Sequence, residues 1–87
     1  MVTRKVVVTD PLGLHLRPAG MFCEASVKFA SKIQIRKGNN MLNGKSVLGV
    51  LAARIQCGDE VELVCDGEDE QEALDTLTKL LEGVLSE

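Results

Sequence analysis

Residues 69–85 read DEQEALDTLTKLLEGVL, and this stretch carries the clearest structural signal in a chain of 87 residues. Its apolar side chains recur at steps of three and four residues, which is the spacing of one face of an α-helix. They are Ala73, Leu74, Leu77, Leu80, Leu81, Val84 and Leu85. Asp69 and Glu72 resemble a capping box at the start of this helix, with Asp in place of Ser or Thr. A helix with one apolar stripe must bury that stripe, so the remaining residues should supply a sheet for it to cover.

Three segments have the composition of strands in such a sheet. Residues 2–8 are rich in Val and Thr, while residues 32–36 and 60–65 alternate apolar side chains with mostly polar ones. Lys-Gly-Asn-Asn at 37–40 is typical of a turn, so it predicts a hairpin that leads into a fourth, short strand near 41–43.

Two further helices are predicted between the strands. Pro18 is tolerated in the first turn of a helix, so we expect a helix that begins between His15 and Pro18. Ser46 is a favoured N-cap residue, and the run 47–53 that follows it predicts a short helix whose Val50 points inward.

The expected order of elements is therefore βαββαβα. We predict an α+β fold, an open-faced β-sandwich in which a four-stranded antiparallel sheet carries three helices on one face. In this interpretation residues 1–87 form a single domain, because a chain of 87 residues buries only enough surface for one modest core.

The net charge of −3 conceals a strong gradient along the chain. Residues 1–56 hold nine Lys or Arg and two acidic residues, whereas residues 57–87 hold one Lys and eleven acidic residues. The first part should therefore attract an acidic partner or a phosphoryl group. The chain has two Phe, no Tyr and no Trp to stack on bases, so this composition disfavours nucleic-acid binding.

Cys23, Cys57 and Cys65 are odd in number and lack CxxC spacing, which argues against a disulfide framework or a zinc site. We expect reduced thiols, no metal and no cofactor. No apolar run approaches the roughly 20 residues of a membrane span, and the N-terminus has no signal-peptide pattern. The expected location is the cytoplasm, without membrane insertion.

The only histidine of the chain, His15, lies within the motif Gly-Leu-His-Leu-Arg-Pro-Ala at residues 13–19. Histidine titrates near neutral pH, and its uncharged ring has a nitrogen lone pair that can act as a nucleophile. A helix that begins here offers free backbone N–H groups and the positive end of its dipole to a phosphate. Arg17 can add charge-assisted hydrogen bonds, so the motif predicts that His15 carries a phosphoryl group.

Residues 13–19 resemble the active-site motif of the HPr family, the phosphocarriers of the phosphoenolpyruvate-dependent sugar phosphotransferase system. Residues 45–51, Lys-Ser-Val-Leu-Gly-Val-Leu, resemble the regulatory-serine region of the same family, and the likeness covers the whole chain. The resemblance implies that phospho-Enzyme I phosphorylates His15 on Nδ1 and that the group then passes to the A domains of sugar permeases. It also implies that Arg17 steadies the phosphate oxygens, and that the protein is a covalent carrier and not an enzyme.

Ser46 has two interpretations. As a plain N-cap it would only stabilise the helix that follows, which is the commonest use of serine at this position. The resemblance implies reversible phosphorylation by an HPr kinase/phosphorylase, with a catabolite-control transcription regulator as a further partner. Phosphoserine would add about −1.5 to −2 charges at a helix N-terminus, which tolerates anions, so its effect should fall on docking and not on folding.

Apolar side chains near the two motifs are candidates for partner docking. Leu16 stands where small residues such as Ala or Thr are common in the family, and it can add an apolar contact. Val47, Leu48 and Leu51 are candidates for an apolar patch beside Ser46, with core packing as the alternative.

Other functions stay open at this point. The resemblance also admits a nitrogen-related phosphorelay, which the sequence does not separate from sugar transport. A small nucleic-acid-binding domain and a stand-alone hydrolase with a histidine nucleophile are the alternatives from other classes. No general-acid partner or cluster of metal ligands supports a hydrolase. Nothing in the sequence points to oligomerisation, so we expect a monomer.

Overall fold

The computed structural model describes residues 1–9 and 16–82, and its elements follow the predicted order. They are β1 (Val2–Val7), α1 (Leu16–Val27), β2 (Lys32–Lys37), β3 (Asn40–Asn43), α2 (Val47–Ala52), β4 (Glu60–Asp66) and α3 (Glu70–Leu81). The boundaries agree with the predicted segments to within a few residues. His15 and the predicted helical positions Val84 and Leu85 lie outside the described residues.

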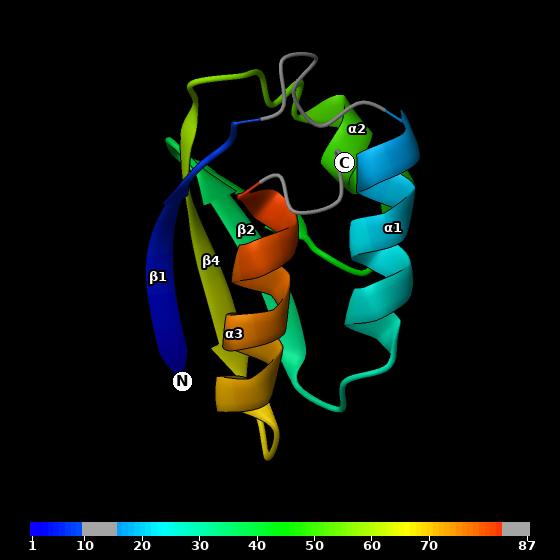
Figure 1. Ribbon diagram of the computed structural model, residues 1–87, viewed down its shortest axis with the longest axis vertical. Helices are drawn as coiled ribbons and strands as arrows, with labels where there is room; N and C mark the ends of the chain where they lie inside the picture. The colour runs from blue at the N-terminus through cyan, green and yellow to red at the C-terminus, as the bar shows by residue number, and fades with distance from the viewer. Residues whose placement is uncertain (10–15, 83–87) are drawn as a thin grey trace.

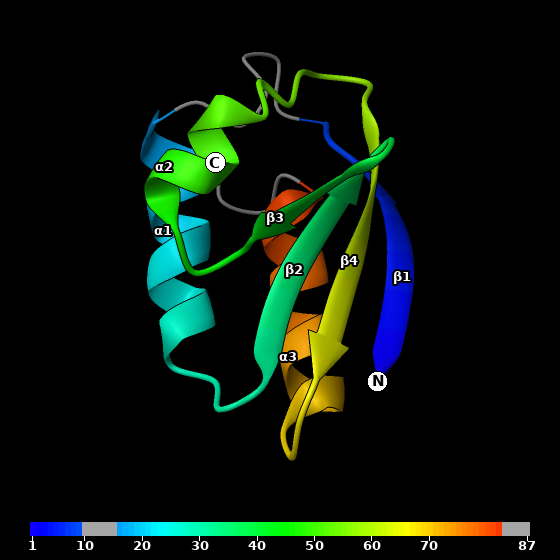
Figure 2. The same cartoon turned by 180° about the vertical axis from the view of Figure 1, so that it is seen from behind.

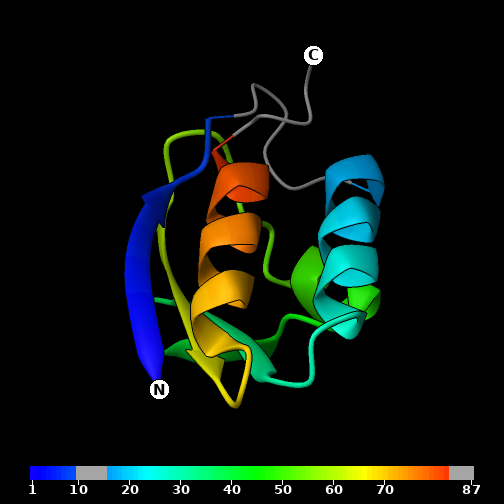
Figure 3. The same cartoon turned by 60° about the horizontal axis from the view of Figure 1, so that its bottom comes forward.

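The sheet is antiparallel throughout and has the strand order β1-β4-β2-β3. β4 is a central strand, in which Val61 lies opposite Val6 of β1 and Cys65 lies opposite Ile33 of β2. α1 and α3 run side by side over one face of the sheet (Figures 1 and 3), and Figure 2 presents the opposite face to the viewer. This arrangement confirms the predicted open-faced sandwich with its helices on one face.

The core lies between the sheet and the helices. The strands and the residues next to them contribute Val6, Val8, Ile33, Ile35, Val61, Leu63 and Cys65. The helices contribute Ala19, Phe22, Cys23, Val50, Ala73, Leu74, Leu77 and Leu81. The inward direction predicted for Val50 is therefore confirmed. Val64 differs from the simple alternation of β4, because it sits on the open face and is still only 5% exposed. Thr3 and Gln34 flank it on the two neighbouring strands, so a central strand can bury an outward residue.

The three cysteines are free thiols, with Cys23 and Cys65 buried and Cys57 exposed. Burial raises the pKa of the Cys65 thiol to about 11, so this side chain is protonated at neutral pH. Cys65 therefore acts as a small apolar side chain in the core.

The capping box predicted from Asp69 and Glu72 is wrong. Asp69 occupies the N-cap position of α3, but its side chain makes no hydrogen bond to that helix. Its carboxylate instead accepts hydrogen bonds from the backbone amides of Ala30 and Ser31, each at 2.9 Å, and from the Ser31 hydroxyl. The backbone amides in the turn that follows α1 require a hydrogen-bond acceptor, and the Asp69 carboxylate provides it.

A glycine allows the two turns to approach each other. Gly67 has a φ of +156°, and a Cβ added there would lie 2.6 Å from the Cα of Ser31. The backbone amide of Gly67 also donates to Glu70 Oε1 at 3.2 Å, so Glu70 takes the local role that the sequence pattern suggested for Glu72.

We predict that Asp69→Asn makes the protein less stable near neutral pH and that this difference shrinks in acid. The hydrogen bond from the Ser31 hydroxyl, followed by that from the Ala30 amide, holds the pKa of the Asp69 carboxyl below its ordinary value of 3.8. A carboxyl whose pKa is lower in the folded state stabilises the fold above its unfolded pKa, and this contribution is lost as pH falls through the folded pKa. Urea denaturation of both proteins at pH 7 and at pH 3 measures the change.

Glu72→Gln is the matched control for this experiment. Glu72 is exposed and makes no hydrogen bond or ion pair among residues 1–9 and 16–82, so its neutralisation should change stability little at either pH. An equal loss of stability in Asp69→Asn at both pH values would contradict the role given to the carboxylate.

Candidate functional site

The first turn of α1 has the features of an anion-binding helix terminus. The helix begins at Leu16, within the predicted interval, and Pro18 lies in its first turn. The backbone amides of Leu16 and Arg17 have no carbonyl four residues earlier within the helix, and amides at this position are the donors that bind anions at helix N-termini. This turn contains no acidic residue that would repel a phosphate. His15, the predicted phosphoryl acceptor, directly precedes this turn and lies outside the described residues.

Side chains in this turn divide between solvent and core. Leu16 is 68% exposed, and Arg17 is also exposed. Ala19 and Phe22 on the other side of α1 are fully buried. The buried face therefore fixes the helix, while the two predicted site residues face solvent.

Ser46 is the N-cap residue of α2, the structural role considered for it in the sequence. Its backbone is extended, with φ −110° and ψ 114°, and its Oγ accepts a hydrogen bond from the Gly49 amide at 3.2 Å. The preceding residue, Lys45, donates from Nζ to the carbonyl of Phe29 at 2.8 Å. This contact ties the start of α2 to the turn that follows α1.

The C-terminal end of α2 is held by a second lysine. Lys37 Nζ, at the end of β2, donates to the carbonyls of Ala53 and Arg54 at 3.2 and 3.1 Å. It also pairs with Asp59 at 3.2 Å. Cations favour the carbonyl end of a helix, so α2 is secured at both ends although it has only six residues.

The four predicted docking residues occupy two different environments. Leu48 is 80% exposed and, like Leu16, faces solvent. Val47 and Leu51 are half-buried and pack against the core. α2 lies beside the first half of α1 in Figures 1 and 2, so these residues gather toward the end of the molecule where α1 begins.

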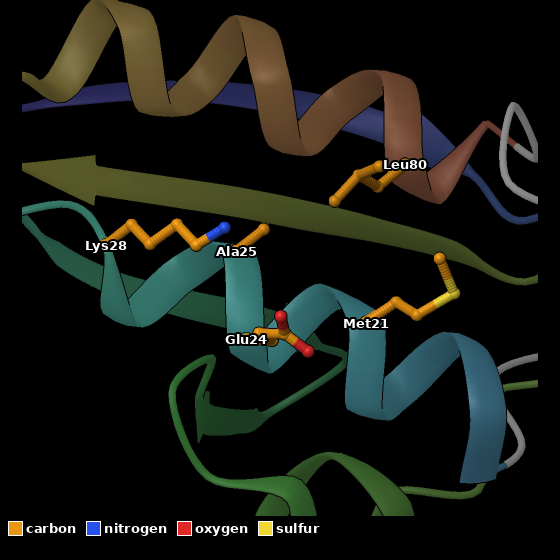
Figure 4. Close-up of a pocket in the computed structure, with 5 residues that line it drawn as sticks. All are labelled: Met21, Glu24, Ala25, Lys28 and Leu80. Carbon is orange, nitrogen blue, oxygen red and sulfur yellow. The ribbon is translucent and has the colours of Figure 1, made fainter.

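Sequence reasoning did not single out a hollow between α1 and α3. Its volume is about 200 Å³. Figure 4 shows the residues that line it, which are Met21, Glu24, Ala25, Lys28 and Leu80. It contains none of the predicted site residues. Its signal in the sequence is the position of Met21 on an otherwise polar side of α1, where it is 37% exposed.

Residues 1–9 and 16–82 hold no candidate metal site and no helix that could span a membrane. This part of the chain contains no group of three or more His, Cys, Asp or Glu side chains placed to hold a metal ion. Its helices are too short or too polar to cross a membrane.

Comparison with known proteins places this fold and site in one family. The family model described as the phosphotransferase-system HPr component phosphorylation site matches residues 2–83. The phosphocarrier protein HPr of Treponema pallidum is 38% identical over 87 residues, which is 100% of this chain and 99% of that protein.

Solved structures show the same likeness. The structure of HPr-C-His from Thermoanaerobacter tengcongensis has a TM-score of 0.94 and 34% identity, and covers 100% of this chain and 98% of that one. The Bacillus subtilis catabolite-repression protein Crh, described as a domain-swapped dimer, has a TM-score of 0.76 and 38% identity, with 93% of each chain covered.

The fold and the phosphorylation-site motif thus define a protein of the phosphocarrier class. The chain belongs to the HPr family of the phosphotransferase system. The resemblance that residues 13–19 and 45–51 predicted is confirmed.

We predict that Ser46→Ala lowers the free energy of unfolding by about 1 kcal/mol, the typical cost of losing an N-cap side chain. The substitution removes the acceptor of the Gly49 amide. Ser46→Asp keeps an acceptor at the same position and should remain within a few tenths of a kcal/mol of the unsubstituted protein. Urea denaturation of the three proteins tests this, and an equal loss in both variants would refute a capping role.

Proposed function

We propose that this protein is a phosphocarrier of sugar transport, which takes a phosphoryl group from phospho-Enzyme I on His15 and passes it to the A domains of sugar permeases. The supporting observation is the first turn of α1, which has the exposed side chain of Arg17 and no acidic residue, and whose amides lie at the positive end of the helix dipole. Family membership supports the same partners in general terms. A nitrogen-related phosphorelay is the alternative within the family.

The proposed transfer uses few groups. Neutral imidazole of His15 attacks phosphorus, a nitrogen–phosphorus bond forms, and the bond from phosphorus to the donor breaks. The phosphoryl dianion then accepts charge-assisted hydrogen bonds from the Arg17 guanidinium and the first-turn amides. The helix dipole contributes only about 0.3–1 kcal/mol, so the guanidinium and the amides supply most of the stabilisation. The high transfer potential of the nitrogen–phosphorus bond lets the next acceptor take the group, which makes the protein a covalent intermediate and not an enzyme.

We propose further that residues 1–87 form a single domain that works as a monomer in the cytoplasm, without a cofactor. Crh of Bacillus subtilis is described as a swapped dimer. The oligomeric state of the present protein should therefore be measured by sedimentation. A second oligomeric form would leave the chemistry of His15 unchanged, provided that the first turn of α1 stays accessible.

Incubation with phosphoenolpyruvate and Enzyme I should add one phosphate to this protein. We expect the product to be labile in acid and stable in base, as a phosphohistidine is, and mass spectrometry measures the gain. His15→Ala should abolish the product, and Arg17→Ala should slow its formation because the dianion loses a charge-assisted partner.

Ser46→Ala is the control for that experiment and should still gain acid-labile phosphate. Uptake of phosphate from Enzyme I by His15→Ala would refute the proposed acceptor. Turnover of a phosphoester by the purified protein alone would favour a hydrolase in place of a carrier.

Ser46 is the proposed regulatory site, phosphorylated by an HPr kinase/phosphorylase. The hydroxyl already lies at the start of α2, where the added charge of about −1.5 to −2 meets the positive end of the helix. Refolding is therefore not expected. The effect falls on docking, because Leu48 lies two residues away and is 80% exposed. A transcription regulator of catabolite control is the proposed reader of the phosphoserine form.

We predict that Leu48→Ser raises the KM for phospho-Enzyme I about fivefold or more, since loss of an apolar anchor that a partner buries exceeds 1 kcal/mol. Phosphorylation of Ser46 by ATP and the kinase should raise the same KM, and its product should be acid-stable and absent from Ser46→Ala. Initial rates of phosphoryl transfer at several concentrations measure these changes.

Met41→Ser is the matched control for Leu48→Ser. Met41 is also exposed, at 42%, but it lies in β3 at the edge of the sheet. Its substitution should leave the KM unchanged. An equal rise in KM for both variants would show that Leu48 has no special part in docking.

A further inference from the structure

The helix α2 is too short to fix its own direction. It has six residues, whereas an isolated helix needs roughly 12–15 to be stable in water, and Gly49 within it lowers its helix propensity further. Of its residues, all of which the structure describes, Val50 alone is buried. One buried side chain holds a helix at a single point, so contacts at the two ends of α2 must set the direction in which it lies.

Lys37 makes the contact at the C-terminal end of α2. Its Nζ donates to the carbonyls of Ala53 and Arg54 at 3.2 and 3.1 Å and pairs with Asp59 at 3.2 Å. An ammonium group has three N–H donors, so these three acceptors occupy all of them. Lys37 ends β2, which is paired on both sides, by β4 and by β3. The rigid part of the sheet therefore holds the segment that follows α2, and Figure 2 shows this segment crossing from α2 to the start of β4.

Asp59 holds the Lys37 ammonium from the other side. Its carboxylate also accepts a hydrogen bond from the amide of Gln56 at 2.9 Å. This amide bond, followed by the bond from Lys37, holds the pKa of the Asp59 carboxyl below its ordinary value of 3.8, so Asp59 is charged at neutral pH. Asp59 directly precedes β4, so the ion pair joins the end of one strand to the start of its neighbour.

Arg54 has a strained backbone at the point where Lys37 binds. Its φ is +51°, and among residues 1–9 and 16–82 it is the only residue other than glycine with a positive φ. Residues with a Cβ rarely adopt this conformation because of steric clashes, and it persists only where the surrounding structure holds it. Here the hydrogen bonds from Lys37 to the carbonyls of Ala53 and Arg54 hold it.

We infer that Lys37 is a positioning residue for partner docking, because its bonds to the carbonyls of Ala53 and Arg54 fix the direction of the helix that presents Leu48. The inference rests on the proposed function, in which Leu48 contacts phospho-Enzyme I. Lys37 acts through α2 and not through its charge. Its loss therefore weakens docking and raises the KM for the donor, whereas the chemical step, and with it kcat, is unaffected.

The test compares Lys37→Met with Lys32→Met. Methionine is similar in length to lysine but has no N–H donor. Lys32 lies at the other end of β2, is exposed, and makes no side-chain hydrogen bond or ion pair with the rest of residues 1–9 and 16–82. Both variants lose one positive charge, so a difference between them reports the contacts of Lys37 and not the net charge.

Two measurements follow the variants. Initial rates of phosphorylation by phospho-Enzyme I give kcat and KM. Hydrogen exchange followed by NMR reports the end of α2 without any phosphoryl transfer, through the amides of Ala53 and Arg54. These amides bond to the carbonyls of Val50 and Leu51 at 3.3 and 3.2 Å.

Lys37→Met should raise the KM about two- to fivefold, up to the effect of removing the Leu48 anchor, with an unchanged kcat. In the double variant with Leu48→Ser the two effects should not multiply, because a contact that is already lost cannot be misplaced. Exchange of the Ala53 and Arg54 amides should become about three- to tenfold faster, while the amides of β4 and α3 keep their rates. Lys32→Met should match the unsubstituted protein in both measurements.

Arg54→Gly tests whether Lys37 acts by holding the strained backbone. Glycine adopts a positive φ without a steric clash, so it needs less support at this position. Added to Lys37→Met, Arg54→Gly should bring both the KM and the exchange rates back toward the values of the unsubstituted protein. Persistence of the full defect in this double variant would show that Lys37 does not act through Arg54.

Three other results overturn the inference on its own. They are an unchanged KM in Lys37→Met, an equal rise in KM in Lys37→Met and Lys32→Met, and a fall in kcat with faster exchange throughout the protein, which would indicate general loss of stability. If the unsubstituted protein takes no phosphate from phospho-Enzyme I, the proposed function fails. The exchange rates still show in that case whether Lys37 fixes α2, so the two failures are distinguishable.

Discussion

The position of α1, and with it the position of the candidate site, depends on the burial of Phe22. Phe22 and Ala19 are fully buried on the inner face of this helix. The fit is close, since a Cβ at Gly44 would lie 2.6 Å from Ile33 and 3.2 Å from the Phe22 ring. Burial of a Phe side chain stabilises a fold by about 1.5–3 kcal/mol, more than the roughly 0.3–1 kcal/mol of a helix dipole acting on a charge. Apolar packing therefore decides where the first-turn amides lie, and electrostatics acts on amides already placed.

The fold places one acidic turn far from the first turn of α1. The acidic turn between β4 and α3 lies at the opposite end of the molecule from the first turn of α1 (Figure 1). Several of its carboxylates are occupied there, since Asp69 accepts from the turn after α1 and Glu70 pairs with the N-terminal amine at 3.1 Å. The charge gradient along the sequence is not simply repeated across the molecule, because Lys32 lies opposite Asp66 at the acidic end and Asp59 pairs with Lys37 at the other.

Features that depend on neighbours in the sequence were predictable, and features that depend on distant residues were not. Periodicity predicted the stripe of α3, because each helical face repeats within a few residues. The inward direction expected for Val50 is also confirmed. The pattern at Asp69 was misread, because its true partners in the turn after α1 are 38 and 39 residues away. The Thr9 hydroxyl donates a hydrogen bond to the carbonyl of Glu82, which is 73 residues away, so no local sequence pattern predicts this contact. Val47 and Leu51 fell between the alternatives considered for them, since α2 half-buries both.

Residues that fix the site and residues that partners can touch are different sets. Phe22 and Ala19 are buried and cannot change size without a cavity or a clash in the core. Leu16 and Leu48 are 68% and 80% exposed, so their side chains contribute little to the core. Position 16 can therefore carry a leucine at no cost to the packing of the helix. Because the core constrains α1 but not these exposed positions, the docking role proposed for Leu16 and Leu48 can change without moving the helix.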